Sequence, residues 1–330
     1  MTFHAVASSR SLDRATKRGR ALRGLIGERS LALVRDSTGA AIAFDDLCPH
    51  RGAPLSQGRI QDGKLECPYH GMRFSMDGEC EVPWIQGACG LRARLVQTHE
   101  QDGLVFASFE DATPPPSLDG PCDFELETFI AAPQLEVIEN FMDSTHTGFV
   151  HAGLIRSDAR MSREVRVRTR ADCVVVDHAP VDEELGLARR WLGHGKIAHR
   201  DTCHRAGTVE VEYFVEHGER HRFFHTLVFV TPERREASIG SRVFVRGRLT
   251  SGSGLFRALV DRIAAQLVKP LGTLILHQDR RVLEASEDAI ARAGRRPKAY
   301  LPEEFMHRQV RRMMSGETLE DDERTFALRL

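Results

Sequence analysis

Short apolar runs separated by turn residues fill the first third of the chain. Residues Ser30–Arg35 form an apolar run typical of a buried strand, Asp36–Gly39 has turn composition, and Ala41–Phe44 resumes the run. The same alternation continues through Met72–Phe74 and Leu104–Phe109. Strands this short, interrupted this often by glycine, predict a small antiparallel β domain.

A proline-rich stretch follows this pattern. Residues Thr113–Ser117 contain three consecutive prolines, which favour a stiff, extended linker. We therefore predict a first domain of residues 1–112, a linker of residues 113–117 and a second domain of residues 118–330.

The second part of the chain mixes extended and helical patterns. Residues 124–137 look extended, and residues 139–151 indicate an irregular helix. Between residues 161 and 246, alternating apolar and polar positions predict a half-buried antiparallel sheet. Its clearest runs are Arg163–Arg168, Thr208–Tyr213, His221–Phe229 and Ser241–Arg246.

Helical spacing dominates the region from Gly254 to about Ala293. Pro270 lies inside this stretch and should divide it, so we expect two helices in tandem that pack on the sheet. The charged residues from Gly294 onward are expected to be peripheral. Together these patterns predict the α+β class: a small β domain beside a larger domain whose antiparallel sheet accompanies long helices.

Composition is that of an ordinary globular protein, with 41% hydrophobic and 28% charged residues and a net charge of -1. This balance gives no reason to expect a nucleic acid or membrane partner. No run of 18 apolar residues occurs, and the start lacks a secretory signal, so we expect a cytoplasmic protein. The locally basic region of residues 10–35 is expected to be a solvated face, the alternative being a docking surface for an acidic electron donor.

The first chemical motif pairs one cysteine and one histidine twice. Cys48 and His50 are separated by one residue, sixteen residues follow, and Cys67 and His70 are separated by two. This is the ligand set of a Rieske [2Fe-2S] cluster, in which two histidines replace two cysteines on one iron. A structural zinc site is the alternative, although zinc ribbons use cysteine pairs of a different spacing.

Glycines and further cysteines complete the description of this motif. Gly52 and Gly71 would allow tight turns beneath a cluster. The other five cysteines are expected to be free thiols in a reducing compartment: Cys80, Cys89, Cys122, Cys173 and Cys203.

The second motif runs from Asn140 to His151 and offers a separate metal site. Two histidines and a carboxylate are the ligands of mononuclear non-haem Fe(II) oxygenases. His146 and His151 are five residues apart, about 140° around a helix, so the helix must end or deform between them, and Gly148 is well placed for this. Asp143 lies three residues before His146 and can reach its surroundings.

Both motifs resemble those of one family. Residues 48–56 and 67–71 look like the Rieske domain of ring-hydroxylating oxygenases. The spacing Asn140-x-x-Asp143-x-x-His146-x-x-x-x-His151 is similar to the mononuclear-iron motif of their α subunits. Cytochrome-type Rieske proteins are less similar, because they carry an additional cysteine in each loop, where this chain has Ala53 and Tyr69, as well as a membrane anchor.

Met72 is a departure from the family, which usually has tryptophan at this position. We interpret it as a change of packing beside the cluster.

The resemblance is to the α, or terminal oxygenase, subunits of the single-subunit-type monooxygenases and O-demethylases, such as dicamba and vanillate demethylases. It implies a catalytic domain of the helix-grip type and a third iron ligand at Asp279, with Glu284 and Asp288 as weaker alternatives. It also implies a head-to-tail homotrimer, in which Asp143 links His70 of one chain to His146 of the next. Asn140 belongs to the same catalytic motif.

The function implied is that of a terminal oxygenase. It would use O₂ to hydroxylate or oxidatively demethylate a small organic substrate, aromatic or alicyclic, as in aromatic hydrocarbon catabolism. Because no nucleotide-binding or plant-type ferredoxin motif occurs, electrons from NAD(P)H must arrive through a separate reductase, ferredoxin or both.

Two alternatives stay open: a dioxygenase or desaturase on the same scaffold, and a Rieske protein that only transfers electrons. Seven apolar residues are possible pocket residues, although each one alone is expected to be core: Phe141, Phe149, Leu154, Trp191, Phe224, Leu227 and Phe229.

Overall fold

The computed structural model describes residues 2–84, 89–152, 154, 162–181, 196–217, 219–235, 238–250, 255–297 and 304–329. These residues form two compact units. The first contains residues 1–115 together with residues 231–237, and the second contains residues 116–230 and 238–330. The α+β class predicted from the sequence is confirmed.

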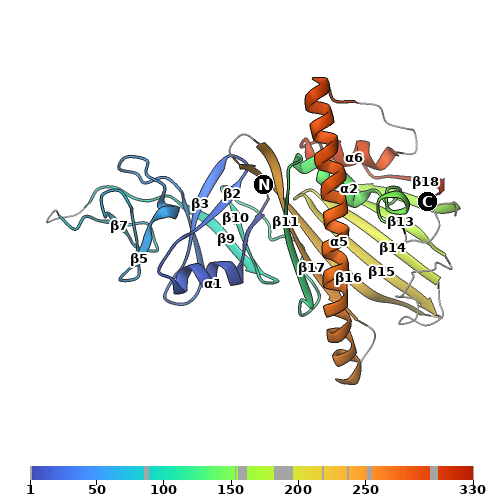
Figure 1. The fold of residues 1–330 in the computed structure, drawn as a ribbon, viewed down its shortest axis with the longest axis horizontal. Coiled ribbons are helices and arrows are strands. Elements are labelled where there is room, and N and C mark those ends of the chain that lie inside the picture. Colours follow the sequence, from blue (N-terminus) through green and yellow to red (C-terminus); the bar gives the residue numbers. More distant parts are fainter. Residues whose placement is uncertain are drawn as a thin grey trace. The chain divides into compact units, whose positions relative to one another are not determined.

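The first unit is built from two antiparallel sheets, whose strand orders are β1-β10-β9-β4-β3-β2 and β5-β6-β7-β8 (Figure 1). One helix, α1 (Ser9–Lys17), and one 3-10 turn, η1 (Leu55–Gln57), accompany them. The strands are β1 (His4–Ser8), β2 (Leu22–Ile26), β3 (Arg29–Arg35), β4 (Ala41–Asp45), β5 (Arg59–Gln61), β6 (Lys64–Glu66), β7 (Arg73–Phe74), β8 (Cys80–Glu81), β9 (Leu95–Gln101) and β10 (Leu104–Ser108).

Strand β3 supports both apolar cores of this unit, because side chains on a strand alternate between its two faces. Leu31 and Leu33 pack into one core, with Leu12 of α1. Ala32 and Val34 pack into the other, which also contains Cys48 and Cys67. The continuous apolar run predicted for this strand is thus confirmed, and it ties the cysteine loops to the rest of the unit.

A segment from much later in the chain completes the first unit. The Thr231 hydroxyl donates to the Ala5 carbonyl at 2.7 Å. The Gly27 amide donates to the Pro232 carbonyl at 2.7 Å, and the Arg234 amide donates to the Gly27 carbonyl at 3.0 Å. Residues 231–234 therefore satisfy backbone groups of β1 and of the turn between β2 and β3.

The expectation that all five remaining cysteines are free is wrong for one pair. Cys80 and Cys89 form a disulfide, with their Cα atoms 5.4 Å apart, a separation that disulfide geometry allows. Cys122, Cys173 and Cys203 are free thiols. Sequence spacing alone could not show that these two cysteines, nine residues apart, lie close together.

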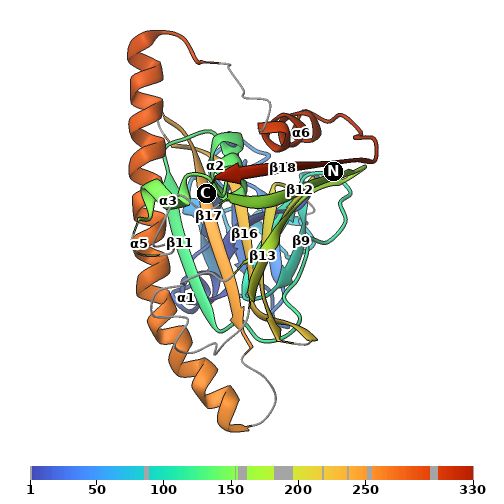
Figure 2. The same ribbon diagram turned by 90° about the vertical axis from the view of Figure 1, so that its right-hand side faces the viewer.

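The second unit is one eight-stranded antiparallel sheet with helices packed on it, in the order β11-β17-β16-β15-β14-β13-β12-β18 (Figures 1 and 2). Its helices are α2 (Gln134–Met142), α3 (Thr147–Val150), α5 (Leu255–Ala293) and α6 (Phe305–Met314). Its strands are β11 (Phe124–Ile130), β12 (Ser162–Arg170), β13 (Cys173–Val181), β14 (Lys196–His204), β15 (Thr208–His217), β16 (Glu219–Arg235), β17 (Ser238–Leu249) and β18 (Asp322–Arg329).

One face of this sheet carries the core of the second unit. Alternate residues on the strands, such as Val174, Val209 and Val228, pack with Ile138 of α2 and Leu276 of α5. We call this the interior face. The strands predicted between residues 161 and 246 are confirmed, and their alternation corresponds to one interior and one exterior face.

Three local predictions were wrong. Residues 134–137 belong to α2 rather than to an extended segment. Helix α5 runs unbroken through Pro270. Proline has no amide proton to donate to the carbonyl four residues earlier, but Pro270 is exposed, so water can donate to that carbonyl instead. The C-terminal region is not peripheral, because Phe305, Val310 and Met313 of α6 are buried in the core and β18 pairs with β12.

None of the helices in the described part of the chain combines the length and the hydrophobicity needed to span a membrane.

Met313 offers a test of the packing of α6. Met313 is fully buried, so Met313→Ala should lower the free energy of unfolding by about 3 kcal/mol, measured by urea denaturation. The neighbouring Arg312→Ala removes an exposed ion pair with Glu317 and a hydrogen bond to Gln309, and it should change the free energy of unfolding by about 1 kcal/mol or less. Equal effects of the two substitutions would contradict this packing.

Candidate metal centres

The two Cys–His loops of the first unit have matching backbone hydrogen bonds. The Gly52 amide donates to the Cys48 carbonyl at 2.8 Å, and the Gly71 amide donates to the Cys67 carbonyl at 3.1 Å. Both glycines have positive φ, +72° and +67°, as predicted for tight turns. In each loop the cysteine amide also bonds to a carbonyl five residues later, at Ala53 or Met72. Two nearly equivalent turns thus hold the four side chains.

The cysteines and histidines lie on different sides of this site. Cys48 and Cys67 are 3% and 2% exposed, whereas His50 is exposed and His70 is half-buried. The two imidazole rings lie 4.8 Å apart, centroid to centroid, inclined at 60°. A cluster with two irons fits this arrangement. The two buried cysteine thiolates would hold one iron, and the two outward histidine imidazoles would hold the other.

Two neighbouring side chains complete these loops. Met72 is 3% exposed and packs in the same core as Cys48 and Cys67, in keeping with a packing role. Tyr69 is 61% exposed, and its ring stacks on that of His70 at 3.8 Å.

The second motif is divided between two short helices. Helix α2 ends at Met142, and Asp143 adopts an extended conformation because its carboxylate accepts hydrogen bonds from the amide and hydroxyl of Thr145. His146 precedes α3 and His151 follows it. The helix therefore breaks before His146, and α3 ends at Val150, between the two histidines as predicted, but Gly148 lies within α3 and not at its end.

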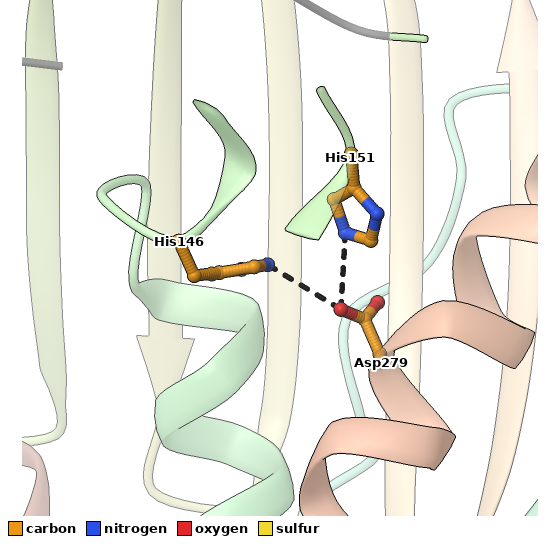
Figure 3. A group of neighbouring side chains, drawn as sticks. All are labelled: His146, His151 and Asp279. Carbon is orange, nitrogen blue, oxygen red and sulfur yellow. Dashed lines mark ion pairs between the residues drawn. The ribbon is translucent and has the colours of Figure 1, made fainter. Parts of the chain in front are cut away.

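His146, His151 and Asp279 converge in the second unit (Figure 3). His146 Nε2 lies 3.4 Å and His151 Nε2 3.0 Å from Asp279 Oδ1. The imidazole rings are 5.2 Å apart and inclined at 75°, so their in-plane lone pairs can meet at one point. Two ligands about 2.1 Å from one ion and at right angles lie about 3.0 Å apart, so this spacing fits a metal ion.

The chemistry of these three side chains also favours a cation. The Asp279 side chain is only 3% exposed. Burial acts to raise the pKa of its carboxyl, but hydrogen bonds to His146 and His151 outweigh burial and lower the pKa to about 2. The buried, ionised carboxylate of Asp279 lies on a helix that packs on the interior face. Together with the two imidazoles it forms a suitable donor set for a ferrous ion.

Gln278 fixes the orientation of one imidazole. His151 Nδ1 lies 2.8 Å from Gln278 Oε1. Because a carbonyl oxygen only accepts, Nδ1 carries the proton in this contact, which leaves Nε2, the nitrogen that faces Asp279, as the one that could bind a metal ion. The sequence motifs did not predict a role for Gln278, although its position beside Asp279 indicates that it can reach the same site.

The remaining residues of the predicted site lie close by. His146 Nδ1 is 3.8 Å from Asp143 Oδ2, which places the acid beside the imidazole but beyond direct hydrogen-bond length. Asn140 lies on the last turn of α2, and its amide nitrogen is buried without a hydrogen-bond partner among the described residues. The two alternative carboxylate ligands have other surroundings. Glu284 bonds to Arg280 and to the Ala131 amide, and Asp288 is exposed.

The possible pocket residues separate by location. Phe141 and Phe224 border the core on the interior face. Leu227 and Phe229 are buried but alternate with the interior residues Val228 and Val230, so they lie on the exterior face. Phe149 is 78% exposed and Leu154 half-buried, and Trp191 lies outside the described residues.

Comparison with family models gives two matches. Residues 2–87 match the Rieske [2Fe-2S] domain, and residues 130–316 match the vanillate O-demethylase oxygenase C-terminal domain. Together the matched stretches contain both groups of side chains described above.

Curated proteins of related sequence include the oxygenase component of dicamba O-demethylase from Stenotrophomonas maltophilia. It is 34% identical over 152 residues, which are 42% of this chain and 45% of that protein. The vanillate O-demethylase oxygenase subunit of a Pseudomonas species is 29% identical, over 46% and 49% of the two chains. The chloroplastic protein TIC 55 of Arabidopsis thaliana is 32% identical, over 42% and 28%. The aligned stretches span about half or less of these relatives.

Solved structures share the fold over nearly the whole chain. Dicamba monooxygenase bound to dicamba superimposes with a TM-score of 0.72 at 22% identity, over 95% of this chain and 96% of that one. A mutant of Pseudomonas putida NdmA with caffeine gives 0.66 at 17% identity, over 95% and 88%.

The Gln278 contact leads to a prediction about metal affinity. Gln278→Met removes the acceptor of the Nδ1 proton, so the affinity for Fe(II) should fall about 10- to 100-fold. The measurement is a titration of iron-free protein against a competing ferrous chelator. His277→Asn, at the exposed neighbouring position, serves as the control and should leave the affinity unchanged. An unaltered affinity in Gln278→Met would show that the contact does not orient the imidazole.

Proposed function

We propose a function from one premise: the chain belongs to the family of oxygenase components that carry a Rieske [2Fe-2S] domain and a vanillate O-demethylase oxygenase C-terminal domain. It is a terminal oxygenase that uses O₂ to hydroxylate or oxidatively demethylate a small organic substrate. Single-oxygen chemistry is favoured over dihydroxylation, because the related proteins include O-demethylases and a component named as a monooxygenase system subunit.

One observation carries this proposal: two imidazoles and a buried carboxylate converge on one point in the second unit, while a separate Cys₂His₂ set lies in the first. The two matching domain models imply a Rieske cluster and a mononuclear iron. When bound, the cluster supplies single electrons and the iron activates dioxygen. A protein that only transfers electrons needs the first set alone, so the second set favours an oxygenase.

The side chains of this chain divide the work. We assign the cluster to Cys48, His50, Cys67 and His70, and the mononuclear iron to His146, His151 and Asp279. Gln278 holds the proton on His151 Nδ1 and so keeps Nε2 available as a ligand. Asn140 is proposed as a further polar residue of the catalytic site.

Electron delivery between the two centres is proposed to cross between subunits. By resemblance to the family, the chain would form a head-to-tail homotrimer, in which Asp143 joins His146 to His70 of a neighbouring copy. The location of Asp143 beside His146 Nδ1 supports its part of this route.

Other components must complete the system. Electrons from NAD(P)H are proposed to come through a separate reductase, ferredoxin or both, in keeping with relatives named as oxygenase components. The cytoplasmic location expected from the sequence is also a proposal, since some relatives are named as chloroplastic.

The function is tested by supplying the holoprotein with a chemical reductant, ¹⁸O₂ and a panel of methoxylated and methylated aromatic and alicyclic compounds. Formaldehyde release, or one labelled oxygen in the product, is the expected result. Two labelled oxygens would favour a dioxygenase, and an olefin would favour a desaturase. Peroxide as the sole product of every compound would contradict the proposal.

The ligand assignment leads to a prediction about metal content. Asp279→Ala removes the carboxylate ligand, so mononuclear iron should be lost while the visible absorption of the cluster persists. Glu284→Ala, on the same helix, should retain both. Iron analysis combined with absorption spectroscopy makes the measurement, and full iron retention in Asp279→Ala would rule out this residue as a ligand.

Asp143 leads to a separate prediction. Asp143→Asn keeps an oxygen that can accept from Thr145, so the fold and both metals should remain. Turnover should fall about 10- to 100-fold, because the charged partner of His146 is lost. Single-turnover kinetics with pre-reduced protein measures this, and normal rates would remove Asp143 from the electron route.

A further inference from the structure

Positive charge is concentrated on one stretch of the first unit. Six basic residues and one acidic residue occur between Ser9 and Ile26, whereas the whole chain has a net charge of -1. All six basic residues are exposed: Arg10, Arg14, Lys17, Arg18, Arg20 and Arg23. We call these six residues the basic face.

Helix α1 directs three of these cations to one side. Arg10, Arg14 and Lys17 follow one another at intervals of four and three residues, so they share one face of the helix. Leu12, the buried residue of α1, lies on the opposite face and packs in an apolar core of the first unit. The basic side chains of α1 are therefore presented to solvent.

A tight helix ending fixes the backbone of the next two cations. The Gly19 amide donates to the Thr16 carbonyl at 2.8 Å, and the Arg20 amide donates to the Ala15 carbonyl at 3.0 Å. These two bonds, with Gly19 at a φ of +65°, form a Schellman motif. The backbone of Arg18 and Arg20 is thus held by the end of α1.

Strand pairing joins this segment to the strand that precedes Cys67. Arg20 forms an antiparallel bridge with Arg59 of β5, and Arg59 is paired with Glu66 of β6, the residue before Cys67. Paired residues on antiparallel strands have Cα atoms about 4.5–5.5 Å apart, and consecutive Cα atoms are about 3.8 Å apart. The Cα atoms of Arg20 and Cys67 are therefore at most about 15 Å apart.

The segment also shares a core with the cluster cysteines. Ala21, the residue after Arg20, belongs to the same apolar core as Cys48 and Cys67. The basic face is thus connected to the thiolate side of the proposed cluster. The imidazole side is assigned to another contact, because one cluster histidine is proposed to meet a neighbouring copy of the chain.

Most of these cations have no acidic partner. Within the described part of the chain, no acid lies at ion-pair distance from four of them: Arg14, Lys17, Arg18 and Arg20. The acids nearby have partners of their own, since Asp13 pairs with Arg35 at 2.9 Å and Glu66 with Arg59 at 2.7 Å. The basic face therefore has positive charge that the first unit itself does not neutralise.

The stability of the helix does not account for the whole basic face. Cations are favourable in the last turn of a helix, which explains Arg14 and Lys17. Arg20 and Arg23 lie beyond the helix, and Arg23 lies on β2, at the edge of its sheet. Like charges gathered in this way repel one another, and a partner with negative charge would relieve the repulsion.

We propose that the basic face binds a small acidic electron-carrier protein of the ferredoxin type, which reduces the cluster from its thiolate side. This inference rests on the proposed function, which requires such a donor. One electron leaves the reduced carrier and one electron enters the oxidised cluster, and no bond forms or breaks. The opposite charges speed the encounter and orient the carrier on the first unit. A nucleic acid is the less suitable partner, because the chain as a whole is not basic.

The experiment uses one probe, a plant-type [2Fe-2S] ferredoxin of acidic sequence. The reduced ferredoxin is mixed anaerobically with the oxidised holoprotein, and freeze-quench electron paramagnetic resonance follows the reduction of the Rieske cluster. The second-order rate constant should fall at least about tenfold between about 50 mM and about 500 mM salt, because salt screens the attraction. Calorimetric titration with the oxidised ferredoxin measures the affinity, which should fall in the same way.

Two double variants locate the charge that matters. Arg18→Glu/Arg20→Glu should lower both the rate constant and the affinity at low salt at least about tenfold, and Arg18→Gln/Arg20→Gln should lower them less. Lys269→Glu/Arg292→Glu is the matched control, because it changes the net charge equally at two exposed positions of α5, and both values should stay within about twofold. Reduction by the methyl viologen radical, a small cation, should not slow in any variant.

Several results would overturn the inference. These are equal slowing in the α1 variant and the α5 control, a rate that does not depend on salt, and no electron transfer from the ferredoxin at low salt. Tight binding of duplex DNA that is lost in Arg18→Glu/Arg20→Glu would overturn it as well. Formaldehyde release with a chemical reductant needs no carrier protein, so its failure would contradict the oxygenase function and leave the binding result standing.

Discussion

The candidate iron site of the second unit depends on the burial of one ionised carboxylate, that of Asp279, between two imidazoles. An unpaired charge in this layer would cost several kcal/mol, and partial pairing with histidines recovers only part of this cost. A bound divalent cation would pair with the Asp279 carboxylate and so stabilise the folded state. Chain folding and metal binding are thus expected to be coupled here, since the three ligands come from segments that meet only when α5 packs on the sheet.

Local patterns in the sequence were sufficient for much of this description. The ligand motifs need only spacing and residue chemistry, and the positive φ of Gly52 and Gly71 follows from the tight loops that such spacing requires. Strand alternation between residues 161 and 246 was equally readable, because one face of the sheet is buried. The recognition of the family rests on these same local features.

Long-range features were not readable in this way. Nothing in the sequence near Gly294 shows that α6 would enter the core, because its apolar positions are interspersed with arginines. Arg308 and Arg312 are exposed, but Arg311 is half-buried and pairs with Glu139 of α2. The break after Met142 depends on whether the Asp143 side chain or the next helical carbonyl accepts the backbone hydrogen bond. These two arrangements differ only slightly in energy, so the sequence does not predict which one forms. The buried group of His178, His199 and Asp201 was not predicted, because each is an ordinary polar residue in a strand, and only strand pairing places them together.

The assignment of residues 231–237 to the first unit determines how that unit can be excised. Its hydrogen bonds to Ala5 and Gly27 mean that the electron-carrying module is not self-sufficient: one of its edges is supplied by a segment synthesised more than a hundred residues after the rest. Excised as residues 1–115, the module would expose these backbone groups to solvent. An exchange of the first unit for a homologous module would therefore have to include this later segment as well as residues 1–115.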